Sequence, residues 1–375
     1  MPERPTAPGP DGAGPPSVFA GAKEVLRQSG PRPLVPGGSG LAQLKAVVGT
    51  LERDEDPDTI VLGAVPFDLS QPGALRVGPA ERSQGPLRGA PGRRPTVASS
   101  RPVPPPQVYA EEVRVALERI GAGEAEKVVL ARSLELTGLE EWSVPDLAAR
   151  LAGRNPAATA LAVPVDDPAR PDARWLVGAS PELLLRRRGP SVLLRPLAGS
   201  IPRSPEPTED LRRAEALMGS EKDRREHAYV VEAVVEGLKP FCRTVSAPEP
   251  ELLATPAVWH LATRVTALLT DRSTTAVDLV AALHPTPAVG GTPRAGALAV
   301  IRDVEQLERG LYAGAVGWQD GDGDGEWVVA VRCAEVRGRS LRIFGGAGIV
   351  AGSVPSAEVE ETAAKMRTVL DAAVG

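Results

Sequence analysis

The chain has 375 residues, of which 42% are hydrophobic and 24% charged, and these proportions suit one or two large folded units. Its 39 glycines and 39 prolines follow no three-residue period, which excludes a collagen-like protein, and its 4 Phe, 5 Trp and 3 Tyr are too few for a surface that stacks bases. The formal net charge of −5 leaves no basic footprint for nucleic acid or anionic lipid, so we expect a small-molecule partner and neither nucleic acid nor membrane.

Cysteine and histidine usage limits the compartment and the metal chemistry. Cys242 and Cys333 are the only cysteines, too few for a disulfide framework, and no stretch has the pattern of a signal peptide or eighteen uninterrupted apolar residues. We therefore expect a cytoplasmic protein. The three histidines, His227, His260 and His284, are far apart in the sequence, so any metal would be held by carboxylates. The sequence does not decide whether these histidines are structural or line a site.

The first 16 residues contain six prolines and three glycines, a composition that buries too little apolar surface to fold. We predict a disordered tail over residues 1–16 and a folded domain over residues 17–375.

The first elements of the domain follow from periodicity. Helical spacing predicts helices over residues 22–28 and 41–52, and an apolar run predicts a buried strand over residues 59–67. The polar stretch 84–106, rich in Arg and Pro, predicts a long surface connection. An amphipathic helix over residues 108–126 follows it.

The rest of the chain groups strands and helices separately. Five short strands are expected at 127–136, 158–165, 174–180, 182–188 and 192–199. The longest helical pattern covers residues 208–242. The last third alternates helices at 274–284, 295–306 and 356–373 with strands at 311–318, 326–336 and 341–350. This order favours an α+β protein built on large antiparallel sheets over a doubly wound parallel fold.

Two predicted helices carry carboxylates at helical spacing. Asp223 and Glu226 are three residues apart and share a helix face, as do Glu358 and Glu361, with Lys365 one turn later. A solvated acidic face near a helix start explains such residues without a metal. If they do hold an ion, oxygen ligands that leave room for waters suit Mg²⁺.

Glycine clusters follow two strands. Residues 344–353 (FGGAGIVAGS) place glycines at a strand end, where they form a tight turn or let backbone N–H groups approach an anion. Residues 320–326 (DGDGDGE) lack the full calcium-loop pattern and predict a hairpin turn.

Two further residues are candidates for proton transfer. Lys127 opens a strand, and in an apolar interior it would lose its proton more easily, as a general base must, although most such lysines reach solvent. Glu182 precedes an apolar strand, where burial would raise the pKa of its carboxyl and make it a general acid.

Nine blocks of sequence occur together in one known family. They are EKVVLAR, GASPELLLR, PLAGS, SEKDRREHAYVV, VWHLATRV, LHPTPAVGG, GEWVVAVRCAEV, GGAGIVAGS and ETAAKM. In order and spacing the chain resembles the chorismate-utilising enzymes, which include isochorismate, salicylate, anthranilate and aminodeoxychorismate synthases. The likeness runs from about Ile60 to the C-terminus and is strongest to siderophore-type isochorismate synthases. It implies a single large α+β domain, an antiparallel β-sandwich rimmed by helices.

The resemblance implies an activity as well as a fold. It is the Mg²⁺-dependent conversion of chorismate to isochorismate, an isomerase reaction that would serve 2,3-dihydroxybenzoate and siderophore biosynthesis or a related aryl-acid pathway. Lys127 matches the lysine that activates water for attack at ring carbon 2. Glu182 matches the acid that protonates the departing 4-hydroxyl.

The resemblance also implies a magnesium site. Glu226 and Glu361 match two direct Mg²⁺ ligands, while Asp223 and Glu358 match residues that hold metal-bound waters.

Substrate contacts follow in the same way. Arg332 and Lys365 match basic groups that bind substrate carboxylates, and Gly199 and Gly346 match backbone contacts. The siderophore-type relatives imply a monomer.

Two positions bear on the product. Ala288 favours an isochorismate synthase, because salicylate and anthranilate relatives usually carry Thr there. Tyr312 points the other way, since many isochorismate synthases carry Phe, although a strand tyrosine also packs for structural reasons. Salicylate synthase, which goes on to eliminate pyruvate from isochorismate, is therefore the alternative activity. A non-catalytic chorismate-binding relative is the alternative of another class.

Overall fold

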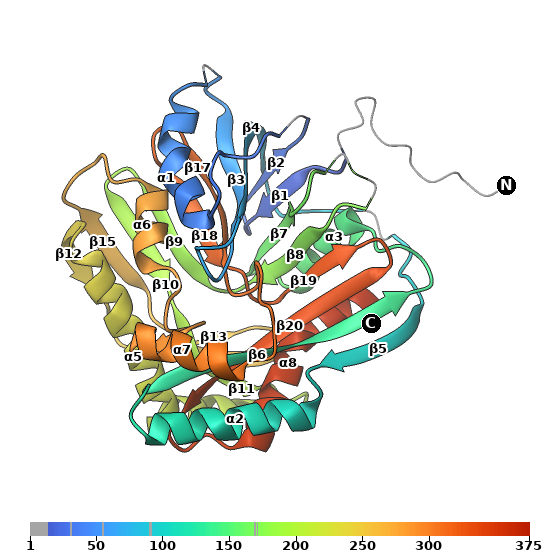
Figure 1. Ribbon diagram of the computed structural model, residues 1–375, viewed down its shortest axis with the longest axis vertical. Helices are drawn as coiled ribbons and strands as arrows, with labels where there is room; N and C mark the ends of the chain where they lie inside the picture. Colours follow the sequence, from blue (N-terminus) through green and yellow to red (C-terminus); the bar gives the residue numbers. More distant parts are fainter. Residues whose placement is uncertain (1–13, 31, 55, 90–91, 169, 171) are drawn as a thin grey trace.

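The computed structural model describes residues 14–375 except residues 31, 55, 90, 91, 169 and 171 (Figure 1). Residues 1–13 of the predicted tail lie outside the described residues. The first strand begins at Ser17, where the folded domain was predicted to begin.

One antiparallel sheet of 17 strands dominates the described residues. Its first half runs through β5 (Val97–Val103), β6 (Lys127–Gly138), β20 (Ser340–Val350), β19 (Cys333–Arg337), β8 (Trp175–Ser180), β7 (Thr159–Pro164), β1 (Ser17–Ala20), β2 (Glu24–Gln28) and β4 (Ala74–Gln84). The short strand β16 (Gly291–Thr292) pairs with the start of β6.

The second half of the sheet continues from β4. It runs through β3 (Thr59–Val65), β17 (Ala315–Asp320), β18 (Gly325–Val329), β9 (Leu183–Arg188), β10 (Ser191–Arg195), β15 (Val265–Leu269) and β12 (Cys242–Ser246). The two halves meet because β4 pairs with β3 through its first residues and with β2 through its last. A separate three-stranded sheet contains β11 (Leu197–Pro202), β14 (Val258–Ala262) and β13 (Glu251–Ala254).

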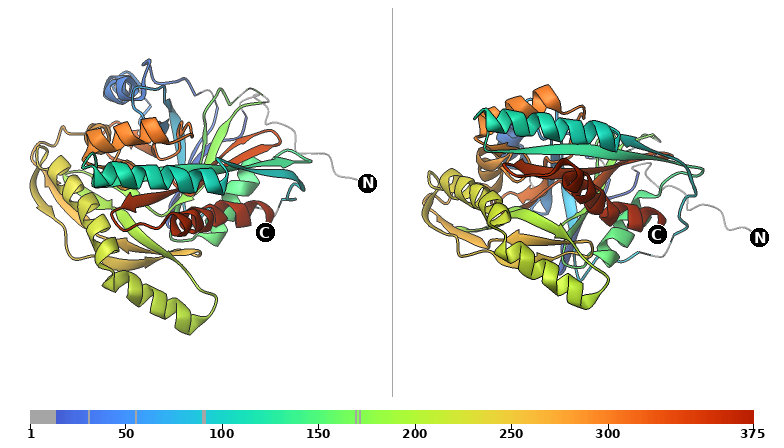
Figure 2. Two further views of the ribbon diagram at one scale, coloured as in Figure 1. Left: turned by 60° about the horizontal axis from the view of Figure 1, so that its bottom comes forward. Right: turned by 90° about the horizontal axis from the view of Figure 1, so that it is seen from below.

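Eight helices cover the sheets in the part of the chain that the structure describes. They are α1 (Gly40–Leu51), α2 (Pro106–Gly121), α3 (Val144–Arg154), α4 (Pro207–Gly219), α5 (Glu221–Leu238), α6 (Ala276–Leu283), α7 (Arg294–Val304) and α8 (Pro355–Val374). Helices α2, α7 and α8 gather beside β6 and β20, whereas α4 and α5 lie together at another side (Figure 2). This arrangement confirms the predicted α+β fold with an antiparallel sandwich and helices around it.

Five predicted elements were wrong in detail. The strand expected at 326–336 is interrupted at residues 330–332 and forms β18 and β19, which lie in different halves of the sheet. Residues 22–28 form no helix but strand β2, because pairing with β1 and β4 overrides the weak helical spacing. The connection 84–106 contains strand β5, which pairs with β6. The strand expected at 192–199 divides at Pro196 into β10 and β11, which belong to different sheets. Ser220 divides the helix expected over residues 208–242.

The break at Ser220 has a local cause. Its backbone is extended, and its side chain accepts a hydrogen bond from the Asp223 N–H at 3.2 Å, so it ends α4 and caps the start of α5. The cap places Asp223 and Glu226 in the first two turns of a new helix.

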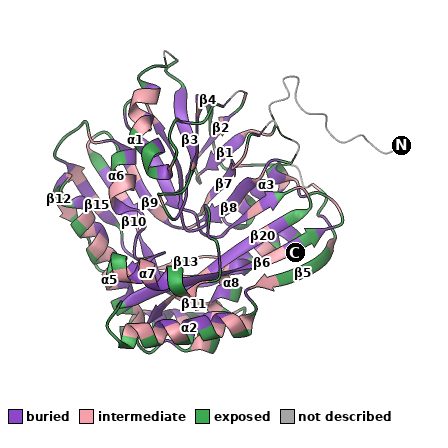
Figure 3. Ribbon diagram, in the orientation of Figure 1, coloured by how far each residue is buried: buried purple, intermediate pink, exposed green. Residues whose placement is uncertain are grey.

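Buried residues run along most strands of the large sheet, whereas the helices carry many exposed residues (Figure 3). The buried apolar side chains form two clusters. The largest cluster joins strands β3, β6, β9, β17, β18 and β20 to helices α1, α2, α6 and α7. A second cluster lies between α3, α8 and the strands β7, β8 and β19. Among the described helices, none combines the length and the apolar character needed to cross a membrane.

Because Leu75 is buried in the core, truncation of its side chain should strongly destabilise the protein. This β4 side chain is fully buried in the main cluster, so Leu75→Ala should lower the free energy of unfolding by about 2–5 kcal/mol. Leu139→Ala is the matched control because Leu139 is 55% exposed, and it should change stability by less than about 0.5 kcal/mol. Urea denaturation measures both variants, and equal effects would contradict the described packing.

Candidate active site

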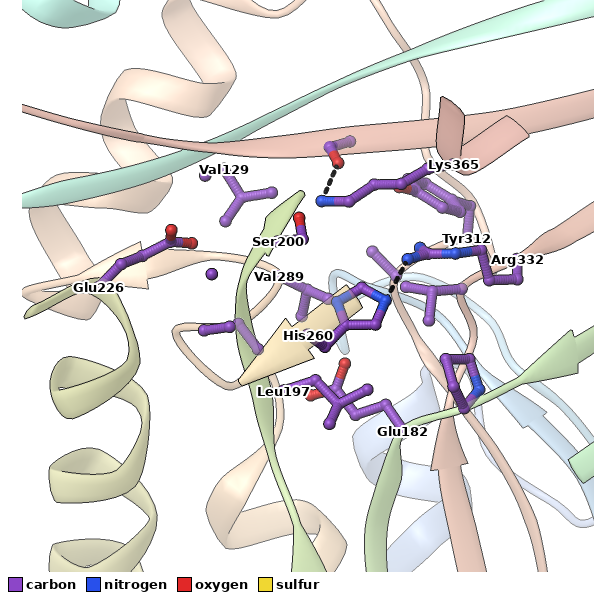
Figure 4. A pocket seen from close by; sticks show the side chains of 18 of the residues that line it. Val129, Glu182, Leu197, Ser200, Glu226, His260, Val289, Tyr312, Arg332 and Lys365 are labelled. Carbon is purple, nitrogen blue, oxygen red and sulfur yellow. Dashed lines mark hydrogen bonds between the residues drawn. The ribbon is translucent and has the colours of Figure 1, made fainter. Parts of the chain in front are cut away.

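A cavity opens between β11, β20, α5 and α8 and encloses about 600 Å³ of space, part of it open to solvent. Eight of the predicted site residues line the cavity: Glu182, Gly199, Glu226, Ala288, Tyr312, Arg332, Gly346 and Lys365. Glu226 lies on the opposite side of the cavity from Tyr312 and Arg332, with Glu182 on a further wall (Figure 4).

Lys127 does not line the cavity but lies directly behind it. The side chain is fully buried at the start of β6, and its Nζ forms an ion pair with Glu226 Oε1 at 2.9 Å. Of the two environments considered for this lysine, solvent exposure is excluded, and the interior that it faces contains a carboxylate. Burial, the largest influence, would raise the pKa of Glu226, but the charges of nearby lysines, Lys127 foremost, together lower it.

Gly348 makes room for this ion pair, although sequence reasoning did not single it out. A Cβ at this position would lie 2.2 Å from Glu226 Oε1 and 3.1 Å from Lys127 Cε. Within the described residues, the two side chains can therefore occupy their observed positions only because residue 348 has no side chain.

The other glycines of this cluster correct a prediction. Residues 344–350 lie inside β20 and not after a strand end. A Cβ on Gly345 would meet the Thr362 carbonyl of α8, whereas a Cβ on Gly346 would lie 2.9 Å from the Tyr312 hydroxyl inside the cavity. The glycines therefore allow close approach on both faces of the strand.

Glu182 has the environment of a proton donor. It follows β8, and its side chain is almost completely buried. Burial raises the pKa of its carboxyl to about 7, although a hydrogen bond from the Leu197 backbone and the charge of Lys127 act in the opposite direction. A carboxyl group with this pKa is partly protonated at neutral pH, as a general acid must be.

Arg332 is held in an unusual conformation beside His260. Its φ is 53°, in the left-handed region that non-glycine residues rarely adopt. Arg332 Nη2 donates a hydrogen bond to His260 Nε2 at 3.1 Å, and burial with the positive charge of Arg332 holds the pKa of His260 well below its usual value. Arg332 Nε is buried with no hydrogen-bond partner among the described residues, which leaves a donor for an anion.

Lys365 reaches the cavity from α8. Its Nζ donates a hydrogen bond to the Gly346 carbonyl at 3.0 Å and pairs with Glu361. Glu361 Oε1 also accepts a hydrogen bond from Ser200 Oγ at 2.8 Å, so α8 and β11 are joined at the cavity wall.

The remaining carboxylates stand beside one another on α5 and α8. Glu358 is almost completely buried; burial raises the pKa of its carboxyl to about 7, and the charge of Glu361 adds to the effect. The pKa of Asp223 is also raised, by burial and by the charge of Glu226. Glu358 pairs with Lys222 at 3.3 Å, yet its Oε2 has no hydrogen-bond partner among the described residues.

These features fit a hard divalent cation. The side chains supply only oxygen donors. Like charges contribute to the raised pKa of Asp223 and of Glu358. Glu358 Oε2 is buried without a hydrogen-bond partner among the described residues. The fit is not complete, because in the described residues no three His, Cys, Asp or Glu side chains converge closely enough to ligate one ion. Lysines pair with the carboxylates Glu226, Glu358 and Glu361 instead.

One of the three histidines lines the cavity, and the other two lie away from it. His227 bonds to Thr263 Oγ1 at 2.8 Å and His284 bonds to the Pro66 carbonyl at 3.1 Å, and burial lowers the pKa of each to about 4. His284 is a structural residue away from the cavity; His227 also lies away from it, with its Nε2 paired and its Nδ1 without a hydrogen-bond partner among the described residues, whereas His260 lines the cavity.

The buried ion pair between Arg309 and Glu305 at the cavity wall was also not predicted from the sequence. Arg309 lines the cavity, binds Glu305 and donates hydrogen bonds to the carbonyls of Val129 and Val289 at 2.6 and 2.7 Å. It therefore ties β6, just after Lys127, to the loop that carries Ala288.

The model of the chorismate-binding enzyme family matches residues 84–374, which include every element of this cavity. The chain belongs to the chorismate-binding enzymes. Among its relatives in this family, the isochorismate synthase DhbC of Bacillus subtilis is 43% identical over 367 residues, covering 94% of this chain and 92% of the relative. The isochorismate synthase EntC of Escherichia coli K12 is 36% identical over 337 residues, covering 88% of this chain and 85% of the relative.

A solved structure agrees with this family assignment. A crystal structure assigned to the 2,3-dihydroxybenzoate-specific isochorismate synthase DhbC of Bacillus anthracis is similar with a TM-score of 0.89 at 38% identity, and each chain is 95% covered. The whole described domain, including both sheet halves, therefore has the architecture of a chorismate-binding enzyme.

The raised pKa of Glu182 predicts a pH dependence of stability. The carboxyl titrates near about 4.3 when unfolded and at about 7 when folded, so the folded protein binds more protons between these values. This contribution is complete below about pH 4.3 and is lost as the pH rises through 7. The unfolding free energy of the wild type relative to Glu182→Gln should therefore fall by up to about 3 kcal/mol between pH 5 and pH 8.

Urea denaturation of the two proteins at a series of pH values measures this difference. The exposed Glu236→Gln, on α5, is the control and should show no such trend. A constant difference between the wild type and Glu182→Gln would contradict a buried, protonated Glu182.

Proposed function

We propose that this chorismate-binding enzyme is an isochorismate synthase, an isomerase that converts chorismate to isochorismate. The observation that carries the proposal is one cavity with Glu182, whose pKa is about 7, on one wall and Glu226, backed by Lys127, on another. The names of the relatives support the same activity.

The proposed reaction exchanges one hydroxyl for another on the ring. Water adds at carbon 2, the double bonds shift, and the bond between carbon 4 and its oxygen breaks. Lys127, as the free amine, takes the proton of the attacking water, and protonated Glu182 gives its proton to the departing oxygen, which leaves as water. One water enters and one leaves, so the product is an isomer, and proton exchange with solvent restores both side chains.

The ion pair imposes a condition on this proposal. In the pair with Glu226, Lys127 is an ammonium, which cannot accept a proton. The lysine can therefore act as a base only when Glu226 binds a different cation.

The proposed cofactor is Mg²⁺, held directly by Glu226 and Glu361 and through water by Asp223 and Glu358. When bound, the ion supplies positive charge that neutralises a ring carboxylate and the charge that develops as the hydroxyl departs. The support comes from the oxygen-only donors and the unpartnered Glu358 Oε2.

The rest of the cavity suits a dicarboxylate. Arg332 has a buried, unpartnered Nε, and Lys365 places a second cation on the same cavity, so we assign both to the carboxylates of chorismate. Gly199 and Gly346 let the backbone approach the substrate closely; a Cβ on Gly199 would lie 3.1 Å from Cβ of Asp223.

Salicylate synthase is the second candidate activity. Tyr312 favours it through the family resemblance, in which the salicylate relatives carry Tyr at this position, and its hydroxyl lies beside Gly346 in the cavity. Its ring also stacks on Phe344 with centroids 4.9 Å apart, which is a structural reason for an aromatic residue there. Ala288, on the opposite loop, favours isochorismate as the product.

We place the enzyme in the cytoplasm as a monomer, in the supply of 2,3-dihydroxybenzoate or a related aryl acid. Its folded unit would span residues 17–375. Both cysteines are buried and free, in agreement with a reducing compartment.

A product assay tests the activity and its residues. Chorismate with Mg²⁺ should give isochorismate without salicylate or pyruvate, and conversion should stop when Mg²⁺ is left out. Lys127→Ala and Glu182→Gln should each lower kcat by about 10²–10⁴-fold with the circular dichroism spectrum unchanged. Lys239→Ala is the control, since this lysine is exposed at the end of α5, and it should keep full activity.

Other products, or other activities of the variants, would each contradict a different part of the proposal. Salicylate with pyruvate would favour the second candidate, and no conversion would favour a non-catalytic chorismate-binding protein. Near-normal turnover by Lys127→Ala or Glu182→Gln would overturn the assigned roles, and full activity without Mg²⁺ would overturn the metal site.

The crowded contact at Gly348 gives a further prediction. In Gly348→Ala the new methyl group must displace the Glu226 carboxylate, so turnover should fall by about 10²-fold. The stability should change by about 1 kcal/mol, because flexible side-chain ends can yield. Gly321→Ala is the control, since no atom lies within 4 Å of a Cβ there. Unchanged chorismate turnover in Gly348→Ala would show that this contact does not matter.

A further inference from the structure

A second hollow lies behind the loop that forms one wall of the substrate cavity. It encloses about 490 Å³ of space, part of it open to solvent, between α5, α6, the loop after α6 and the start of α7. Most of its wall is apolar, supplied by Ala233 and Val234 of α5, Leu283 of α6, and Pro285 and Pro287 of the loop. Neither the proposed reaction nor the magnesium site uses any of these residues.

One positive charge faces this hollow without a counter-charge. Arg294, the first residue of α7, lines the hollow and donates a hydrogen bond to the His284 carbonyl at 2.6 Å. Burial lowers the pKa of its guanidinium, and no carboxylate among the described residues forms an ion pair with it. The residue is exposed at the mouth of the hollow, and a guanidinium whose printed hydrogen-bond partner is a neutral carbonyl leaves donors that favour an anion.

A buried hydroxyl points to the same conclusion independently. Thr286 lines the hollow and is only 4% exposed, yet its Oγ1 has no hydrogen-bond partner among the described residues. Buried hydroxyls are normally paired, and a missing partner indicates a ligand or solvent at that place. Arg294 and Thr286 therefore offer hydrogen-bond donors to one space with apolar walls.

We propose that this hollow is a second ligand site, which binds a compact monocarboxylate with an apolar body. A single guanidinium balances one negative charge, and the hydroxyl can donate to the second carboxylate oxygen. The apolar walls suit a ring or a short branched chain. A phosphate or a dicarboxylate would leave charge unpaired against those walls.

The loop connects this ligand site to the substrate cavity. Pro285, Thr286 and Pro287 face the hollow, whereas Ala288 and Val289 line the substrate cavity. The Val289 and Gly290 N–H groups both donate to the Thr286 carbonyl, so a hydrogen-bonded turn joins the wall of the hollow to the wall of the substrate cavity. Occupancy of the hollow therefore changes the position of Ala288, and substrate and carboxylate alter each other's affinity by the same factor.

Benzoate is the probe, and benzamide is its uncharged counterpart of equal shape. Equilibrium dialysis should show one benzoate bound per chain and much weaker binding of benzamide, in the presence and absence of saturating chorismate. Arg294→Gln should weaken benzoate binding by about tenfold or more, and Thr286→Val should weaken it several-fold. Arg302→Gln is the matched control, an exposed arginine on the same helix, and it should bind benzoate as the wild type does.

Ala233→Leu gives a test that leaves the polar groups in place. The larger side chain fills the hollow from α5 and should abolish benzoate binding. Thermal unfolding of all variants identifies any loss of fold, and a folded Ala233→Leu that still binds benzoate would overturn the site.

Two other results would also overturn it. Absence of benzoate binding by the wild type would do so, as would displacement of benzoate one for one by chorismate, which would place it in the substrate cavity. A benzoate effect on the KM of chorismate that disappears in Arg294→Gln supports the connection through the loop, and no effect on KM overturns that connection. The binding measurements need no turnover, so they stand apart from the proposed activity.

Discussion

The antiparallel pairing of β6 with β20 is the constraint on which the site depends. It joins residues 127–137 to residues 340–350 in an unbroken register, so Lys127 lies opposite Val350 and Ala131 lies opposite Gly346. Because strand register fixes which side chains share a face, this ladder brings Lys127 and Gly348 to Glu226 of α5. A slip of one residue would turn the lysine to the opposite face of the sheet.

Most charged side chains around the cavity are paired with a group of opposite charge from the same chain. Lysines 127, 222 and 365 each pair with a carboxylate, and His260 is a neutral acceptor for Arg332. Taking charges out of water is costly unless they are paired, so the lysines let carboxylates lie close together in the folded chain.

Much of the fold was readable from periodicity, and the misses have physical causes. The buried run of β3 and the helical stripe of α8 were predicted because each element carries its own pattern. Strands β2 and β5 were missed because partners far away in sequence stabilise them, not local preference. The division at Ser220 was missed because one capping bond interrupts a helical pattern that continues on both sides.

The sequence by itself determined the chemical types at the site and the family to which they belong. Spacing placed Glu226 and Glu361 on helix faces, and the ordered blocks indicated a chorismate-binding enzyme. Only the tertiary structure decided that a carboxylate faces Lys127, that burial raises the pKa of Glu182 to about 7, and that Gly348 must lack a side chain. These properties depend on desolvation and on contacts between distant strands and helices, which exist only once the sheet has closed.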